Sequence, residues 1–150
     1  MWILIGMLVV GLLLYVPITM STNNYYKNQL QKYNLSNGNI RIQIGNIDTG
    51  TIFIYSRDKR LFYGYPIGNQ FNEIKIKNIL KIEMEAKYEY KGKQKVVSLT
   101  PQSTITGKEI GVTLRIITED NVYNVFVSTN KKNDAIRLKT LLEKQMSEVV

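Results

Sequence analysis

The chain begins with an apolar stretch, residues 1–20, that contains no charged side chain. A helix of this length would reach about 30 Å, the thickness of the hydrocarbon core of a bilayer. A cleaved secretory signal would start with basic residues and end at an A-x-A pattern, and neither is present. The stretch therefore predicts a retained membrane-spanning helix, with an uncleaved or unusual export signal as the alternative.

Two aromatic residues and two glycines of this predicted helix bear on its position in the membrane and on its packing. Trp2 and Tyr15 lie near its two ends, where aromatic rings prefer the level of the lipid headgroups. Gly6 and Gly11 are five positions apart, so the glycine-x-x-x-glycine dimer motif is absent. We expect these four residues to lie within the membrane-spanning segment.

The segment 21–39 is polar and reads as a juxtamembrane linker with one helical turn or more through residues 25–33. Its tyrosines would lie either at the membrane surface or incidentally in a loosely ordered tether. Lys27 and Lys32 follow the apolar stretch, and no lysine or arginine precedes it. The positive-inside rule then predicts a single-pass protein of the cell membrane with its domain in the cytoplasm.

From residue 40 the apolar positions recur with period two, which is typical of half-buried strands. The residues between 101 and 111 are expected to form a loop, and 119–121 the turn of the clearest hairpin. The pattern predicts about seven antiparallel strands, drawn from the runs 40–44, 51–56, 61–65, 74–76, 82–90, 96–99, 112–118 and 122–128.

The run 82–90 alternates most regularly, with charged side chains on one face and apolar ones on the other. Beyond it, residues 133–150 change to a period of three and four, with Asn133 as the expected N-cap. The helical stripe is expected to cover the core of the sheet and not to bind a partner, and it consists of Ala135, Leu138, Leu142, Met146 and Val149.

Composition narrows the possible chemistry. The net charge of +8 lies wholly after residue 20, so the domain is basic and suits an acidic partner or an anionic membrane face. The chain has no cysteine and no histidine, which excludes thiol chemistry and removes the usual metal ligand and neutral-pH base. We therefore expect no enzyme, no catalytic, cofactor-binding or metal-binding residue, and no cofactor.

Two lysine- and arginine-rich turns are candidates for contact with an anionic surface. Lysines at hairpin tips also keep strands soluble and strand edges unpaired, which is the simpler interpretation. The candidate residues are Arg57, Lys59 and Arg60 in the first turn and Lys91, Lys93 and Lys95 in the second.

Other motifs favour no chemistry. Glu83, Glu85 and Glu89 alternate with lysines, as expected of charge balance on a solvated strand face. Thr106-Gly-Lys-Glu109 lacks the first glycine and the hydroxyl residue of a phosphate-binding loop. Ten tyrosines together with 20 basic residues suit nucleic-acid binding, but the tyrosines in 82–90 lie on the apolar face of their strand, which argues against that partner.

The order of elements and two phrases of sequence resemble bacterial pleckstrin-homology-like proteins. The phrases are EIKIKNILKIE at 73–83 and LRIITEDNVYNVF at 114–126, followed by the helix 133–150. The resemblance covers residues 40–150 and implies a small β-barrel or sandwich capped by one helix, with service as an adaptor. The connection 45–50, where eukaryotic relatives carry a basic phosphoinositide-binding cluster, has no lysine or arginine.

The sequence thus predicts a mainly β fold with a C-terminal helix (α+β): an anchor (1–20), a linker (21–39) and a pleckstrin-homology-like domain (40–150). The expected function is a bitopic, non-enzymatic adaptor or scaffold. Its partners would be the lipid bilayer and another membrane or cytoplasmic protein, with the oligomeric state open. The alternative function is a structural subunit of a bacterial secretion or conjugation apparatus, with the domain outside the membrane.

Overall fold

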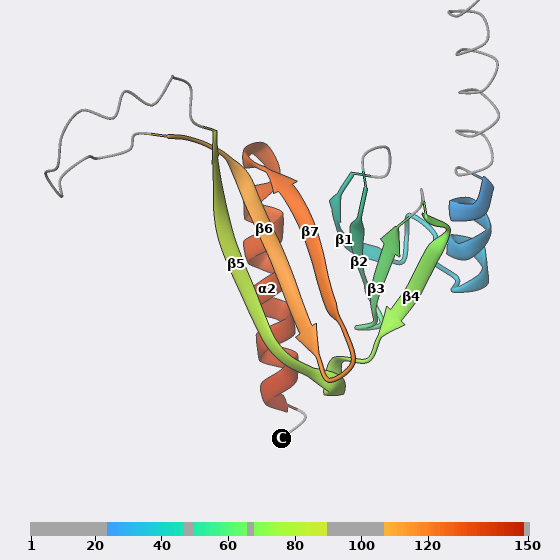
Figure 1. Ribbon diagram of the computed structural model, residues 1–150. Helices are drawn as coiled ribbons and strands as arrows, with labels where there is room; N and C mark the ends of the chain where they lie inside the picture. The colour runs from blue at the N-terminus through green and yellow to red at the C-terminus, as the bar shows by residue number, and fades with distance from the viewer. Residues whose placement is uncertain (1–23, 47–49, 66–67, 90–106, 149–150) are drawn as a thin grey trace, which may run out of the picture. The chain divides into compact units, whose positions relative to one another are not determined.

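Strands of five or six residues, rich in β-branched and aromatic side chains, build the first sheet of the computed structural model (Figure 1). They are β1 (Ile40–Gly45), β2 (Ile52–Ser56), β3 (Leu61–Tyr65) and β4 (Gln70–Ile74). All neighbours are antiparallel, in the order β1-β2-β3-β4. The structure describes residues 24–46, 50–65, 68–89 and 107–148. The chain divides into two units, Met1–Ile76 and Lys77–Val150.

A helix over residues 24–32 packs against one face of this sheet. The rings of Phe62 and Phe71 stack at 5.8 Å, and Tyr33 lies 5.1 Å from Phe62. The opposite face of the sheet is also apolar, since Ile44 and Phe53 are fully buried. The buried cluster on the helix side consists of Tyr26, Leu35, Ile52, Ile54, Phe62 and Phe71.

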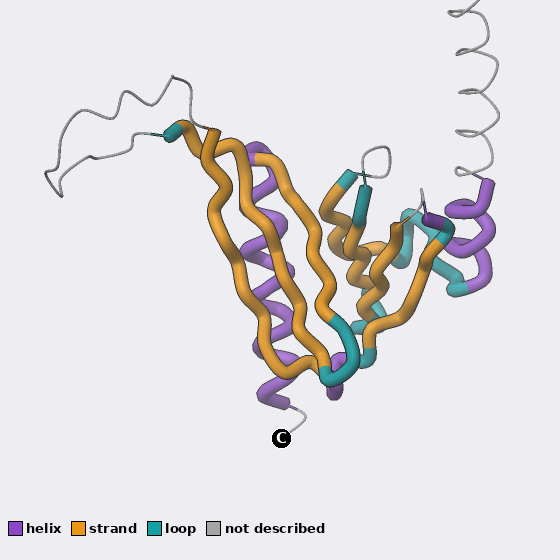
Figure 2. Tube along the Cα trace, in the orientation of Figure 1, coloured by secondary structure: helices purple, strands orange, loops and turns teal. Residues whose placement is uncertain are grey.

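The second unit is a three-stranded antiparallel sheet with one long helix. Its strands are β5 (Ile79–Glu89), β6 (Lys108–Thr118) and β7 (Val122–Ser128), in the order β5-β6-β7. The short helix η2 (Ile76–Asn78) precedes β5, and η3 (Thr129–Lys131) leads into α2 (Lys132–Glu148). Figure 2 shows α2 running along one face of this sheet.

Alternation along the strands decides which side chains α2 covers. Val112, Leu114 and Ile116 of β6 are buried, as are Val125 and Val127 of β7. From α2, the buried residues are Ala135, Leu138 and Leu142, which confirms that most of the predicted stripe is core; Met146 is half-buried and Val149 lies outside the described residues.

The predicted closed β-barrel is wrong. The described strands form two separate antiparallel sheets, one of four strands and one of three, and no barrel closes among the described residues. The physical reason is that each sheet buries an apolar face beneath its own helix, so it need not curl round to close on itself. A mainly β chain ending in a helix is nevertheless what the structure contains.

Several predicted boundaries also change. The strand expected at 74–76 is not formed. Ile74 is the last residue of β4 and Ile76 the first of the 3-10 helix η2, and both side chains are buried, so the pattern of burial does not distinguish the two elements. The expected loop after residue 101 gives way to β6 from Lys108 onward. Asn133 is not an N-cap, since α2 already begins at Lys132, directly after η3.

The predicted membrane anchor is not supported, and neither are the single-pass localisation in the cell membrane and the cytoplasmic placement derived from it. Within the described part of the chain, no helix has the length and apolarity needed to cross a bilayer. The longer one, α2, has 17 residues and carries charged side chains along its exposed face. Residues 1–20, and with them Trp2, Gly6, Gly11 and Tyr15, lie outside the described residues.

Candidate functional site: the open edge of β5

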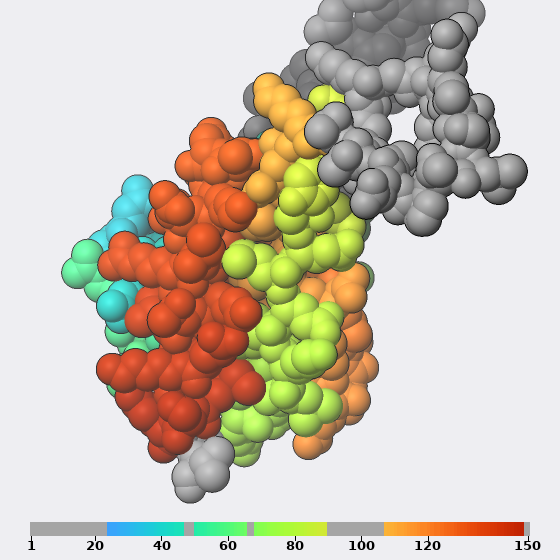
Figure 3. Space-filling view, turned by 90° about the vertical axis from the view of Figure 1, so that its left-hand side faces the viewer, coloured from blue at the N-terminus to red at the C-terminus, as the bar shows by residue number. Residues whose placement is uncertain are grey.

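Strand β5 lies at the edge of its sheet and is 11 residues long. It pairs with β6 on one side, and no described strand pairs with its other side. In an antiparallel sheet every second residue of such a strand points its N–H and C=O groups outward. Figure 3 shows β5 at the surface of the molecule beside α2. The strand therefore offers a row of backbone donors and acceptors to a further strand.

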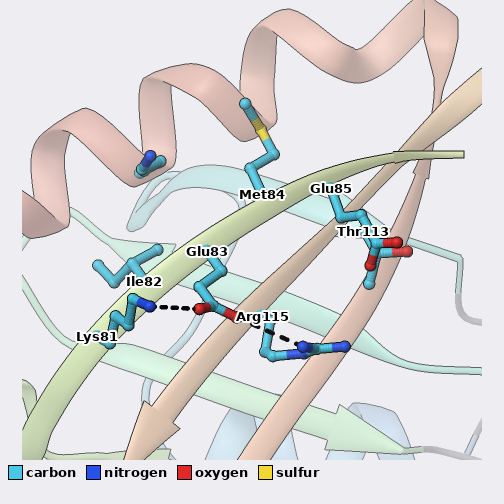
Figure 4. Close-up of a pocket in the computed structure, with 8 residues that line it drawn as sticks. Lys81, Ile82, Glu83, Met84, Glu85, Thr113 and Arg115 are labelled. Atoms are coloured by element: carbon cyan, nitrogen blue, oxygen red, sulfur yellow. Dashed lines mark hydrogen bonds and ion pairs between the residues drawn. The ribbon is translucent and has the colours of Figure 1, made fainter.

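An open groove of about 540 Å³ follows this edge. It is lined by residues of β5 on both faces, by Thr113 and Arg115 of β6 and by Lys139 of α2. In Figure 4, Ile82 and Met84 point toward the helix, whereas Glu83 and Arg115 lie on the opposite face of the sheet. The groove thus has an apolar wall and a charged wall.

Ion pairs organise the charged wall. Lys81 Nζ lies 2.7 Å from Glu83 Oε1, and Arg115 Nη1 donates to Glu83 Oε2 at 3.4 Å. Arg115 Nε also donates to Asn124 Oδ1 at 3.0 Å, which orients the guanidinium. The hydrogen bond and charge of Lys81 hold the pKa of Glu83 below its ordinary value. Glu83 is consequently ionised at neutral pH.

The charged wall continues toward the end of β5. Lys87 Nζ lies 3.4 Å from Glu85 Oε1 on the same face. These pairs confirm the predicted charge balance for Glu83 and Glu85. Along the edge the signs therefore run cation, anion, anion, cation and anion at Lys81, Glu83, Glu85, Lys87 and Glu89.

The apolar wall becomes more exposed toward the end of β5. Ile82 is buried, Met84 and Ala86 are half-buried, and Tyr88 is 47% exposed. Leu80 of β5 and Ile110 of β6 have no partner in the β5–β6 register, which is continuous from Lys81 to Lys87. The segment 81–87 therefore pairs regularly, with one irregularity between Lys87 and Tyr88, and β5 has one polar and one increasingly accessible apolar side.

In the first predicted basic turn, Arg60 contacts other residues of its own unit. Arg60 grips Glu73 with two hydrogen bonds, from Nε at 2.9 Å and from Nη2 at 2.7 Å, and its guanidinium lies 4.9 Å from the ring of Phe62. The fully buried Ser56 closes this turn by accepting from the Arg60 N–H at 3.0 Å. Arg57 and Lys59 are exposed in the same turn. Arg60 thus stabilises the first unit.

Of the two predicted basic turns only the first is described, since Lys91, Lys93 and Lys95 lie outside the described residues. Among the described residues, no group of three or more acidic side chains is arranged to hold a metal ion. In the part of the chain that the structure describes, the groove along β5 combines an open strand edge with an apolar and a charged wall, which makes it the candidate binding site.

No protein-family model, curated protein or solved structure matches this chain. The resemblance to pleckstrin-homology-like proteins therefore stays an expectation.

Proposed function

We propose that this protein is a non-enzymatic adaptor or scaffold that binds a protein partner by adding the partner's strand to the edge of β5. The observation that carries the proposal is an 11-residue edge strand bordered by a groove of about 540 Å³. In strand addition, backbone hydrogen bonds supply affinity and the alternating side chains supply specificity. Both are available along residues 81–89.

The charges on β5 favour a protein partner over a lipid surface at this edge. Cations and anions are mixed there, and Glu83 is already held by Lys81 and Arg115. An anionic membrane attracts continuous clusters of lysine and arginine, which this edge does not offer. An extended peptide can instead match each sign with its opposite.

The same charges argue for a selective interaction. Edge strands that are long, flat and hydrophobic aggregate indiscriminately, and charged side chains on the edge prevent this. Lys81, Glu85 and Lys87 have exposed side chains on β5, so a strand of arbitrary sequence would place like charges opposite one another. The expected partner strand carries complementary charges on one face and apolar residues on the other.

Site-specific photocrosslinking in cells tests the proposal. A photoreactive amino acid at Glu85 should give discrete protein adducts, whereas the same group at Lys144, on the exposed face of α2, should not. The variant Glu85→Lys/Lys87→Glu, carrying the photoreactive group at Tyr88, should lose most of its adducts because it rearranges the charges on the edge. Equal labelling from β5 and α2, or no labelling from β5, would rule out a binding role for this edge.

A further inference from the structure

We infer that the strand received by β5 is β5 of a second copy of this chain. The two strands would run antiparallel about a two-fold axis at Glu85, so that two three-stranded sheets join into one of six strands. This inference rests on the proposed function and names its partner. Three features of the edge carry it: the sequence of charges, the apolar pairs on the other face and the accessible backbone.

Charge complementarity singles out the register. With the axis at Glu85, Lys81 of one copy lies opposite Glu89 of the other, and Glu83 lies opposite Lys87. Symmetry repeats both pairs, so two kinds of pair give four opposite-charge contacts across the seam. Directly opposite charges on neighbouring strands stabilise a sheet. The one pair of like charges is Glu85 with Glu85 of the second copy. Lys87 on the same strand, with its Nζ 3.4 Å from Glu85 Oε1, offsets this repulsion.

Neighbouring registers are poorer. Moving the axis to Met84 places Lys81 opposite Lys87 and Glu83 opposite Glu85, so each of these pairs is repulsive. Moving it to Ala86 places Glu83 opposite Glu89, which cancels the favourable contact of Glu85 with Lys87. A slip by one residue sets the charged face of one strand beside the apolar face of the other. The order of charges therefore selects one self-pairing and opposes its neighbours.

The apolar face fits the same register. Ile82 would lie opposite Tyr88 of the second copy, and Met84 opposite Ala86. Tyr88 is 47% exposed in the single chain, and this pairing would cover its ring. The groove beside β5, bordered by Lys139 of α2, provides space for these side chains. The exposed aromatic residue thus gains an apolar contact where the strand reaches its end.

Cysteine substitutions test the register directly, because the full chain contains no cysteine. Glu85→Cys would set two thiols opposite each other at the axis, within the distance that a disulfide bridges. Glu83→Cys would set its two thiols four residues apart along the seam, about 13 Å, which is too far. Under mild oxidation the full-length Glu85→Cys chain should give a covalent dimer, the Glu83→Cys chain should not, and an equal mixture of Glu83→Cys and Lys87→Cys chains should.

Charge reversal supplies a second, independent test by analytical ultracentrifugation of the full chain. Glu83→Lys and Lys87→Glu each turn two attractive contacts into repulsive ones and should weaken self-association about tenfold or more. Mixing the two variants restores opposite charges at every one of those contacts and should recover the dimer. Recovery on mixing also shows that both variants are folded, because an unfolded strand has no edge to pair.

The outcomes separate this inference from the proposed function. A Glu85→Cys chain that stays monomeric, Glu83→Cys chains that cross-link equally well, or charge variants that do not recover on mixing would each overturn the self-pairing. If the photoreactive group at Glu85 then labels a different protein, strand addition stands and the second copy is the wrong partner. If it labels no protein, both fall.

Discussion

Removal of the Arg60 guanidinium should reveal how much its contacts with Glu73, Phe62 and Tyr33 stabilise the first unit. The side chain makes a two-pronged ion pair with Glu73, with N–O distances of 2.9 and 2.7 Å. It also lies over two aromatic rings, 4.9 Å from the centroid of Phe62 and 5.9 Å from that of Tyr33. One substitution therefore removes an ion pair and a cation–π contact together.

The size of the effect follows from exposure and geometry. The side chains of Arg60 and Glu73 are 37% and 35% exposed, so solvent screens their ion pair, and its two-pronged geometry places it near the upper end for exposed pairs, about 1 kcal/mol. The contact with Phe62 adds about 0.5 kcal/mol, while the ring of Tyr33 lies close to the distance limit. We expect Arg60→Ala to lower the free energy of unfolding by about 1.5 kcal/mol, and Glu73→Ala by about 1 kcal/mol.

A double-mutant cycle measured by urea denaturation separates these terms. Arg60→Ala, Glu73→Ala and the double variant should give a coupling energy of about 1 kcal/mol at pH 7. Arg60→Lys keeps the charge but loses the paired hydrogen bonds to Glu73 and the stacking on Phe62. It should therefore recover less than half of the stability lost in Arg60→Ala.

The coupling should also depend on pH. The hydrogen bond and charge of Arg60 lower the pKa of Glu73 in the folded state. A carboxylate whose pKa falls on folding stabilises the fold fully above its ordinary pKa, and that contribution disappears as the pH drops through the lowered value. Coupling below about 0.3 kcal/mol at pH 7, or equal coupling on both sides of this acid transition, would refute the assigned role of Arg60.

Three further substitutions and one control test the packing. Phe62→Ala, in the fully buried cluster beneath helix 24–32, should cost about 3 to 5 kcal/mol in urea denaturation, and a loss under about 1 kcal/mol would contradict the assigned core. Gly111→Ala would bring its Cβ against the carbonyl oxygen of Val127 and should lower the stability by about 2 kcal/mol or more. Gly38→Ala, with its nearest neighbour at 3.8 Å, should change the stability little, and equal effects would count against the close β6–β7 approach. The buried hydroxyl of Tyr26 has no hydrogen-bond partner among the described residues, and burial raises the pKa of Tyr26 to about 12, so Tyr26→Phe should leave the melting temperature equal or higher; a clear drop would mean that the hydroxyl is satisfied.

The spacing of apolar residues located the strands and the helix far better than it showed which strands pair with each other. Alternation locates β2, β3 and β7 closely, and the stripe of Ala135, Leu138 and Leu142 correctly marks the covered face of α2. A period of two says which side of a strand is buried, but not which strand lies next to it. The division into two sheets was therefore not visible in the sequence.

Residues 24–39 show the limit of composition. Their asparagines and charges are typical of a linker, yet Tyr26 and Leu35 are buried in the first core, and the ring of Tyr33 contacts Phe62 and Phe71. A few large side chains spaced along a polar segment are enough to bury one side of a short helix. The tyrosines that composition placed at a membrane surface or in a tether instead belong to a core.

Only part of the candidate site could be predicted from the sequence. The alternation of charges from Lys81 to Glu89 can be read directly from the sequence, and it gave the correct solvated face. That β5 lies at the edge of its sheet depends on long-range pairing with β6, whose residues follow many positions later. Only the three-dimensional pairing turns a row of balanced charges into a binding edge.

The order of the strands also governs how the chain folds. In both sheets every described strand pairs only with strands adjacent to it in sequence. In the first sheet the connections between paired strands are short, whereas β5 and β6 are separated by residues 90–107. Short-range pairing gives a low contact order, which is associated with rapid folding. During synthesis on the ribosome, β1 to β4 can therefore assemble as soon as the chain has emerged past Ile76, before the strands of the second unit have left the ribosome.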